Sequence, residues 1–309
     1  MRRVLKWTLW ALLALFLLSL PFIHSILAVQ APVNAPVAVV EGWMPEERLC
    51  TAADTLLARG YTKVHTTGTV RPFAYYLLVN EAVDVVLRED VTGEVMVMAA
   101  GQDGAYLQLL SGADTLRTWA LSTAMQRFSH TLSGIHRQFR LRSINPAHPE
   151  STTSNVYTLR FEVNGLNVHG LQQETRFVRT DGRMEEAWPT YAHAAAAKLV
   201  ACGIPAERVQ AIPTWGRPDS RSWGNAATFG AYAQREGYTA VDLISLGVHA
   251  RRSRNLMRRG CGPSVTVGVI SLDDPRCPRV GWWKHWKGWF YVLKEVVGAS
   301  VPYAVDITR

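Results

Sequence analysis

The stretch Ser245-Leu-Gly-Val-His-Ala-Arg-Arg-Ser-Arg254 follows the apolar run Val241–Ile244 and decides the fold class of this chain. A short apolar run next to glycine is typical of a buried strand, and the residues after it are typical of a helix. His249 then lies where a strand is followed by a helix. In open α/β sheets, ligands bind at that place, outside the carboxyl ends of the strands. The stretch therefore predicts an α/β domain with a ligand site at His249.

Basic residues follow His249 on the expected helix. Arg252 lies in the first turn, where its side chain and the free backbone N–H groups can reach a ligand at the end of the strand. Imidazole changes its charge near neutral pH, and guanidinium binds carboxylates and phosphates with two parallel hydrogen bonds. We therefore expect His249 and Arg252 to line a pocket for a small anion.

Length and charge limit the classes of function. The chain has 309 residues, 48% of them hydrophobic, which is enough for a substantial core and excludes wholesale disorder. Its formal net charge of +8 favours anionic partners such as phosphates, acidic glycans or lipid head groups. Because no nucleic-acid-binding motif is present, we expect no nucleic acid partner.

The N-terminal segment Val4–Leu27 is nearly all apolar and has basic residues near its start (Arg2, Arg3 and Lys6). About twenty such residues span a bilayer, and the positive flank stays in the cytoplasm. A cleaved signal peptide is the alternative, but Pro32 disfavours cleavage after Ala31. We expect an uncleaved transmembrane anchor over 1–28. If the source is bacterial, this makes a single-pass inner-membrane protein with its bulk in the periplasm.

The α/β pattern occupies 36–79 and 185–309 and is interrupted between them. Its strands are expected at Val37–Val40, Lys63–Thr67, Val209–Pro213, Val241–Ile244 and Val265–Ser271. Short β-rich segments with regular turn signals fill 80–178, which is typical of a sandwich or barrel. We therefore predict a parallel α/β sheet interrupted by an inserted β-sandwich.

The four cysteines show no metal-ligand spacing. Outside the cytoplasm they would face an oxidising compartment. Cys261 and Cys277 flank an expected strand and could be bridged. Cys50 and Cys202 fall on expected helices, where we expect them to be buried apolar residues.

The last expected helix, Trp282–Val297, is rich in aromatic residues. The helical spacing puts six apolar side chains on one face (Trp282, Trp283, Trp286, Trp289, Phe290 and Leu293), with Lys284, Lys287 and Lys294 elsewhere. Such a face can lie in a membrane interface or pack on the sheet, and we favour packing on the sheet.

A series of short motifs occurs in a specific order: VVEGWMP (39–45), ARGY (58–61), TTG (66–68), AHAAAAKLVACGIP (192–205), RSWGNA (221–226) and GVHARR (247–252). In order and spacing they resemble the SanA/ElyC/YdcF-like envelope proteins of unknown function. The resemblance implies a Rossmann-like sheet whose ligand crevice is lined by Glu41, Gly42, Gly68, Arg221, Ser222, Asn225, His249 and Arg252. The first loop departs from the commoner glycine-rich pattern, which argues against a pyrophosphate cradle there.

Part of the insert resembles a calcium-dependent xylan-binding carbohydrate module. The matching segments are TGEVMVMAAG (92–101), NP (145–146), SNVY (154–157) and FEVNG (161–165). The resemblance implies an envelope glycan as a partner. Calcium sites usually include carboxylates, and the loop offers Asn145, Glu150, Ser154 and Asn155 but no Asp. We therefore assign no metal ligand, and no cofactor is identified.

Two functions fit these residues, and whether the protein is an enzyme stays open. It could transform a phosphorylated or lipid- or nucleotide-linked sugar in envelope polysaccharide or peptidoglycan biogenesis. His249 would then be the acid or base, with Glu41 as its partner or as a second acid/base group, and Arg221 and Arg252 would hold the anion. Alternatively, it is a non-catalytic scaffold that binds a ligand or glycan. A purely structural role for the His and Arg residues ranks last.

Overall fold

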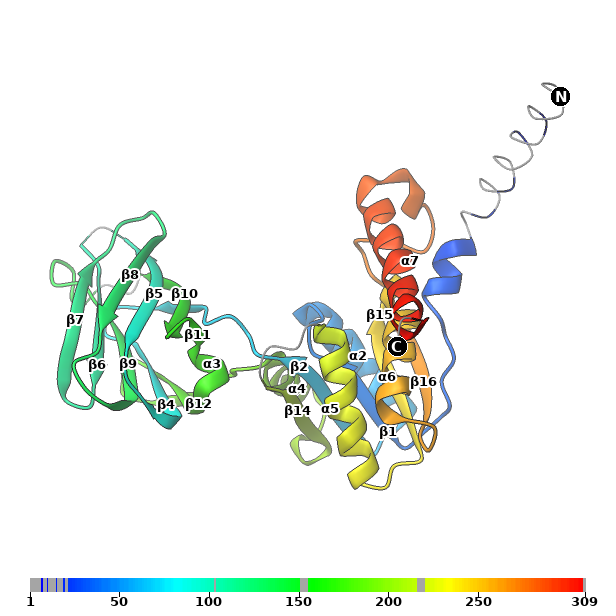
Figure 1. Cartoon of the computed structure of the whole chain (residues 1–309), viewed down its shortest axis with the longest axis horizontal. Coiled ribbons are helices and arrows are strands. Elements are labelled where there is room, and N and C mark those ends of the chain that lie inside the picture. Colours follow the sequence, from blue (N-terminus) through cyan, green and yellow to red (C-terminus); the bar gives the residue numbers. More distant parts are fainter. Residues whose placement is uncertain are drawn as a thin grey trace. The chain divides into compact units, whose positions relative to one another are not determined.

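The computed structural model describes residues 7, 10, 15, 19, 22–102, 104–150, 155–215 and 220–307. The chain divides into two compact units (Figure 1). The α/β unit comprises 1–69 and 192–309, and the inserted unit comprises Val70–Tyr191. The fold is thus mixed α/β.

A parallel sheet forms the centre of the α/β unit. Its described strands are β1 (Val37–Glu41), β2 (Lys63–Thr69), β14 (Val209–Thr214), β15 (Ala240–Leu246) and β16 (Thr266–Leu272). They lie in the order β14-β2-β1-β15-β16, and every neighbouring pair is parallel. Helices cover both faces of the sheet, so consecutive residues are buried along β1, β15 and β16, whose sequences are largely apolar. The strand β2 is buried as well, although its sequence KVHTTGT is mostly polar.

Helices pack on both faces of this sheet. On one face, α2 (Glu46–Arg59) and α4 (Tyr191–Ala201) bury Ala38 and Val40 of β1. On the other, α5 (Arg221–Arg235) and α6 (Ala250–Cys261) bury Val37 and Val39. Short 3-10 turns complete the unit, η1 (Ala206–Arg208), η2 (Gly247–His249) and η3 (Trp282–Lys284), followed by the helix α7 (Trp286–Ile307). Strand alternation places Glu41 on the α5/α6 face.

The inserted unit consists of two antiparallel sheets that share one apolar core. One sheet has the order β11-β10-β5-β8, with β3 also paired to β10, and the other has the order β13-β12-β4-β9-β6-β7. The elements are β3 (Tyr75–Leu77), β4 (Ala82–Val91), β5 (Glu94–Gly101), β6 (Tyr106–Ser111), β7 (Asp114–Ala120), β8 (Gln126–Thr131), β9 (His136–Ile144), β10 (Val156–Val163), β11 (Leu166–Asn167), α3 (Val168–Leu171), β12 (Gln172–Val178) and β13 (Met184–Glu186). Phe139 and Phe161 are fully buried in the shared core.

The inserted unit is longer than the expected 80–178. At its start, β3 pairs with β10, and at its end β13 pairs with β12, so both belong to its sheets. An antiparallel bridge between Val70 and Thr190 brings its two ends together. The strands β3 and β13 are only three residues long, which is too short for a periodic pattern to appear in the sequence.

The cysteine expectations were wrong. Cys50 of α2 and Cys202, after α4, form a disulfide with Cα atoms 5.3 Å apart. Cys261 and Cys277 are free and buried, and burial raises the pKa of both thiols to about 11. Because α2 and α4 lie on the same sheet face, their ends approach each other despite a sequence separation of 152 residues.

The expected transmembrane segment, 1–28, falls mostly outside the described residues. Among the residues that are described, no helix combines the length and the apolar character needed to cross a bilayer.

Glycines allow α5 and α6 to approach closely. A Cβ atom on Gly230 would lie 1.9 Å from the Gly260 carbonyl oxygen. We expect Gly230→Ala to lower the free energy of unfolding by about 1–3 kcal/mol, because the two helices must move apart. Urea denaturation measures the change. Gly170→Ala is the control, since a Cβ there meets nothing within 4 Å. Equal effects of the two substitutions would contradict the packing argument.

Candidate functional site

The candidate site lies at the carboxyl ends of two neighbouring strands. Glu41 is the last residue of β1, Ser245 lies near the end of β15, and His249 ends the η2 turn that follows β15. Because β1 and β15 are adjacent and parallel, their carboxyl ends meet at one edge of the sheet. The fold thus brings these side chains together from distant parts of the sequence.

Glu41 is a buried carboxylate that receives two hydroxyl hydrogen bonds. Ser245 Oγ donates to Oε2 at 2.5 Å, and Ser253 Oγ of α6 donates to Oε1 at 2.8 Å. His249 Nε2 lies 3.7 Å from the same Oε1 atom. A buried carboxylate needs such partners, because removing it from water costs several kcal/mol, on the order of 2–7 for even a neutral polar group. The serines therefore hold Glu41 in place beside the imidazole.

Glu295 of α7 is the second buried carboxylate of the cluster. Arg252 binds it with two hydrogen bonds, Nε to Oε2 at 2.7 Å and Nη2 to Oε1 at 3.1 Å. His249 Nδ1 lies 3.0 Å from Oε1. Burial alone would raise the pKa of Glu295, but the hydrogen bonds from His249 and Arg252 outweigh it and lower the pKa to about 2. Glu295 is therefore ionised at neutral pH.

The ionised Glu295 determines which imidazole nitrogen carries a proton. A carboxylate can only accept hydrogen bonds, so a nitrogen 3.0 Å from Oε1 must donate. His249 Nδ1 therefore carries hydrogen, and the 3.0 Å separation between Arg252 Nη2 and Nδ1 is a contact rather than a hydrogen bond. In the neutral imidazole the Nε2 lone pair then faces Glu41. This is the arrangement of a general base oriented by a carboxylate.

Trp43 and Gly42 shape the loop after β1. The Trp43 ring meets the His249 ring edge to face, with centroids 5.0 Å apart and an interplanar angle of 86°. This contact restricts rotation of the imidazole. The Gly42 N–H donates to the Thr67 carbonyl oxygen at 2.7 Å, so it closes the loop instead of facing a ligand.

The charges of the cluster differ from the expected anion pocket. The guanidinium of Arg252 is engaged by Glu295, and a second carboxylate, Glu41, lies on the other side of His249. Two of the five N–H donors of Arg252 are thus used to hold Glu295, so Arg252 acts here as a positioning residue. The arrangement can hold and move a proton at His249, and a bound anion would need other partners.

The remaining expected ligand residues make no recorded contact with the His249 cluster among the described residues. Gly68 is inside β2, paired with Pro213, rather than in a loop after the strand. Arg221, Ser222 and Asn225 lie in the first turns of α5, which Ser220 caps by accepting from Trp223 N–H. Among the described residues, no hydrogen bond or ion pair links Arg221, Ser222 or Asn225 to His249, and the buried Asn225 Oδ1 has no partner.

No metal centre is apparent in the described part of the chain, where no three His, Cys, Asp or Glu side chains are grouped to hold an ion. In the turn Asp273-Asp274, a pair of adjacent acids directly after the strand β16, Asp274 is buried and bound to Arg276 through Oδ1 and Oδ2, each at 2.9 Å.

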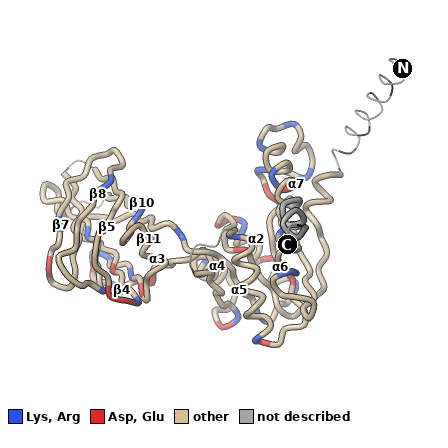
Figure 2. The backbone as a smooth tube through the Cα atoms, in the orientation of Figure 1, with Lys and Arg blue, Asp and Glu red and all other residues tan. Residues whose placement is uncertain are grey.

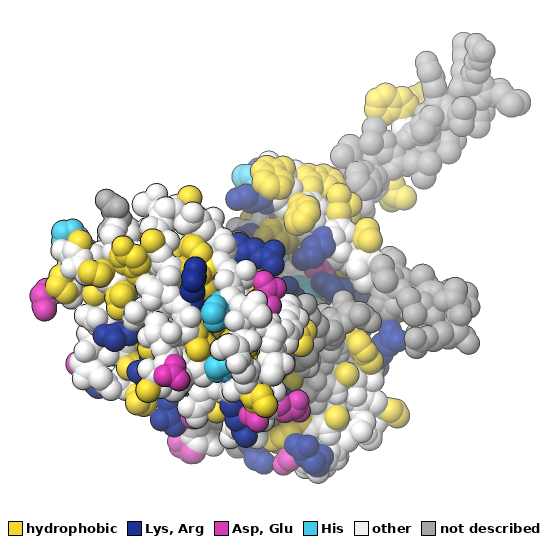
Figure 3. Space-filling view, turned by 60° about the vertical axis from the view of Figure 1, so that its left-hand side comes forward, with side chains coloured by type: hydrophobic (Ala, Val, Ile, Leu, Met, Phe, Trp, Pro, Cys, Tyr) yellow, Lys and Arg dark blue, Asp and Glu magenta, His cyan; other side chains and the backbone are white. Residues whose placement is uncertain are grey.

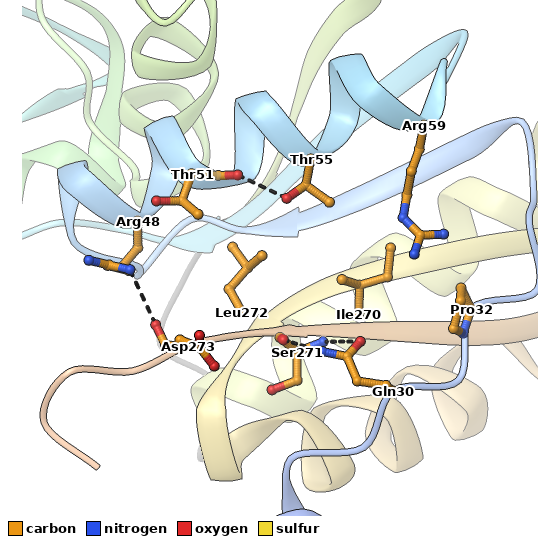
Figure 4. Close-up of a pocket in the computed structure, with 10 residues that line it drawn as sticks. All are labelled: Gln30, Pro32, Arg48, Thr51, Thr55, Arg59, Ile270, Ser271, Leu272 and Asp273. Carbon is orange, nitrogen blue, oxygen red and sulfur yellow. Dashed lines mark hydrogen bonds between the residues drawn. The ribbon is translucent and has the colours of Figure 1, made fainter. Parts of the chain in front are cut away.

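A separate cavity of about 520 Å³ lies on the α2 face of the sheet (Figure 4). Its lining residues are Gln30, Pro32, Arg48, Thr51, Thr55, Arg59, Ile270, Ser271, Leu272 and Asp273. Arg48 Nη1 donates to the Asp273 carbonyl oxygen at 3.5 Å, and the Gln30 side chain binds the backbone of Ser271. Since Glu41 faces α5 and α6, this cavity is on the opposite sheet face from the His249 cluster.

Sequence reasoning missed four members of the cluster: Trp43, Ser245, Ser253 and Glu295. Ser245 and Ser253 were inside the segment already singled out, four residues before and after His249. A polar residue at the end of a buried strand, and another one helical turn beyond His249, are the signals that could have found them. Glu295, an isolated acid in the apolar helix α7, is a comparable signal.

The low pKa of Glu295 makes stability depend on pH. Because its pKa is about 2 when folded and 4.5 ordinarily, it stabilises the fold above about pH 4.5, and this contribution is lost as the pH falls to 2. We expect the urea midpoint of the native protein to approach that of Glu295→Gln over this range, as the native protein loses about 3 kcal/mol of its free energy of unfolding. Urea titrations at several pH values measure it. Parallel pH profiles of the two proteins would contradict the prediction.

The chain was also compared with known proteins. No protein-family model matches it, and no curated protein matches it. Among solved structures, a family two carbohydrate esterase from Cellvibrio japonicus is similar with a TM-score of 0.22 and 11% sequence identity, over 63% of this chain and 71% of that one. At this TM-score the similarity does not establish a shared fold or activity.

Proposed function

We propose that the protein is a membrane-anchored, extracytoplasmic protein of envelope polysaccharide or peptidoglycan biogenesis. Its His249 cluster would bind and transform a phosphorylated or lipid- or nucleotide-linked sugar. The resemblance to SanA/ElyC/YdcF-like proteins supports this proposal, as do the apolar segment Val4–Leu27 and the net charge of +8. The parallel sheet is, in this proposal, a Rossmann-like domain, and the inserted unit is a β-sandwich resembling a carbohydrate-binding module.

The disulfide supports the location. Structural disulfides persist in oxidising compartments such as the periplasm and are rare in the cytosol. The Cys50–Cys202 bond joins two helices of the α/β unit, so that unit belongs on the outer side of the inner membrane in this proposal.

The observation that carries the proposed activity is the position of His249 between two buried carboxylates. Glu295 orients the imidazole through Nδ1, and Arg252 fixes Glu295. His249 Nε2 is then the atom that accepts a proton from the substrate or returns it. Glu41 Oε1, 3.7 Å from Nε2, is the second group that can take up or return a proton. The anionic group of the ligand would be bound outside this cluster, for which Arg221, Ser222 and Asn225 are the candidates from sequence.

The test uses the full chain in mild detergent with two defined probes, a UDP-sugar and a polyprenyl-diphosphate-linked sugar. We expect the phosphorus NMR spectrum of one probe to change with time in the presence of the native protein. His249→Asn should abolish turnover but retain binding of the probe, because it removes the base and leaves the surroundings intact. His285→Asn, at an exposed position, is the matched control. Unchanged spectra with both probes would contradict catalysis, and full turnover by His249→Asn would contradict the role of His249 as the base.

A non-catalytic, glycan-binding function is the second candidate, and one surface feature favours it. Tyr76 is 69% exposed and stacks on Tyr157 with ring centroids 4.7 Å apart. An exposed aromatic face of this kind can pack against the apolar C–H face of a sugar ring. Titration with xylan and soluble peptidoglycan fragments tests this function. We expect Tyr76→Ala to weaken binding at least tenfold, while Ile135→Ala, also an exposed apolar position in the inserted unit, leaves it unchanged.

A further inference from the structure

The helix α7 has one side buried against the protein and an opposite side that is exposed and apolar. Towards the protein, Val292 and Glu295 are buried, and Val292 packs on the buried Trp282 of η3. Away from the protein, four apolar residues are exposed: Trp286 (73%), Phe290 (57%), Leu293 (54%) and Val297 (61%). They recur at positions i, i+4, i+7 and i+11, so they form one continuous row, which we call the α7 stripe.

The helical spacing in the sequence predicted that six apolar side chains of this segment, five of them aromatic, share one face. The structure divides them, because the chain leaves the helical conformation at His285, between η3 and α7. Trp282 and Trp289 pack together with ring centroids 5.0 Å apart, whereas Trp286 and Phe290 belong to the α7 stripe. Packing on the rest of the protein therefore accounts for the first pair but leaves the stripe exposed, with ring contacts from its own helix neighbours Tyr291 (to Phe290) and Lys287 (to Trp286).

The end of the N-terminal segment packs beside α7. Residues 22–27 are helical, and Leu27 belongs to the same apolar cluster as Trp282 and Val292. The His24 Nε2 atom lies 3.0 Å from the Cys277 carbonyl oxygen, which joins the segment to the turn before η3. Phe22 is 66% exposed and Ile26 is 52% exposed. Exposed apolar side chains are thus present both on α7 and on the end of the expected membrane anchor.

Basic side chains border the α7 stripe. Lys284, Lys287, Lys294 and Arg279 are all exposed. Figure 2 shows Lys and Arg positions along the chain around the start of α7. Helical geometry places Lys287 and Lys294 beside the α7 stripe rather than opposite it. The space-filling view shows hydrophobic side chains gathered in this region with Lys and Arg next to them (Figure 3). Tryptophan and phenylalanine bordered by lysine are the composition of helices that lie in the interface of an anionic bilayer.

We propose that the α7 stripe, with Phe22 and Ile26, lies in the interfacial region of an anionic lipid bilayer. This inference rests on the membrane anchoring in the proposed function and adds a second, independent contact with the same bilayer. Its apolar row enters the boundary between head groups and acyl chains, and the lysines bind lipid phosphates.

The position of α7 links this contact to the candidate site. Glu295 lies on the side of α7 opposite to the stripe, so the two are separated by about one helix diameter, roughly 10 Å. The His249 cluster is therefore held at the level of the lipid head groups. A substrate carried by a membrane lipid would reach it without leaving the bilayer, which favours the lipid-linked member of the substrate class proposed above.

The test places a spin label at Phe290→Cys in the full chain, reconstituted in vesicles of phosphatidylethanolamine and phosphatidylglycerol. The natural cysteines are bonded or buried, so the new thiol is the accessible one. We expect the label to be accessible to dissolved oxygen and protected from a water-soluble nickel complex. Arg235→Cys, exposed at the end of α5, is the control and should stay accessible to nickel. Replacing phosphatidylglycerol with phosphatidylcholine should reduce the protection at position 290.

A third label, at Leu15→Cys, separates this inference from the proposed anchor. Protection at position 15 together with full nickel accessibility at position 290 would overturn the α7 contact and leave the anchor intact. Nickel accessibility at both positions would overturn both. Short distances between two 290 labels, unchanged on transfer from detergent to vesicles, would also overturn the proposal, because they would assign the stripe to a second copy of the chain.

Discussion

Replacing Glu295 with alanine is expected to lower the free energy of unfolding by about 3 kcal/mol, because it leaves the charge of Arg252, whose side chain is only 19% exposed, without its carboxylate partner. The carboxylate makes two hydrogen bonds to Arg252 and one to His249, and all three are lost together. The same substitution frees the imidazole to rotate. Urea denaturation followed by tryptophan fluorescence measures the change, since Trp282 and Trp289 pack together in the adjoining apolar cluster.

Glu207→Ala is the control for this experiment, because Glu207 is exposed in the η1 turn. We expect it to change the stability by less than about 0.5 kcal/mol. Arg252→Met in the background of Glu295→Leu should recover much of the lost stability, since replacing both partners removes the unpaired charge. A loss of under about 1 kcal/mol for Glu295→Ala would show that the cluster does not have the paired geometry described above.

Removing the disulfide is the second large effect that we expect. The double substitution Cys50→Ala and Cys202→Ala should lower the free energy of unfolding of the α/β unit by about 2–5 kcal/mol. The bond links positions 152 residues apart, so it restricts the unfolded chain strongly. Urea denaturation with and without dithiothreitol measures the effect, and the reductant should destabilise the native protein but not the double variant.

Cys261→Ala is the matched control, because Cys261 is a free, buried thiol in the same unit. Its loss of stability should be about 1 kcal/mol, from the smaller side chain alone, and dithiothreitol should still destabilise this variant. Thiol titration of the unfolded, unreduced protein should find two reactive groups. Finding all four cysteines reactive would contradict the pairing.

Apolar runs predicted β1, β15 and β16 of the parallel sheet, whereas β2 (KVHTTGT) and β14 (VQAIPT) were predicted from their places between helices. The expected strands Val37–Val40 and Val241–Ile244 lie within β1 and β15, and the others agree to within a few residues. Strands buried on both faces have continuous apolar sequences, so this signal is local and strong. The limits of the inserted unit depended instead on two three-residue strands, β3 and β13, which are too short to show a periodic pattern, and β3 pairs with the distant β10.

Only the part of the candidate site that lies at the ends of the strands could be predicted from the sequence. Glu41 and His249 both follow buried strands, so their proximity follows from parallel pairing. The partner of Arg252 did not follow, because Glu295 is 43 residues away on a helix whose packing direction no local pattern specifies. For the same reason the sequence assigned Arg252 to a ligand, whereas the structure pairs it within the protein.

The disulfide has one more consequence, which concerns proteolysis. Cys50 precedes the inserted unit and Cys202 follows it, while Val70 and Thr190 close the unit at its base. A protease that cuts a loop of the inserted unit therefore produces two polypeptides that stay covalently joined. Strands β1 and β2 remain attached to the piece that carries β14, β15 and β16 until a reductant is added. The α/β unit can thus survive as a two-chain protein after its peptide backbone has been cut.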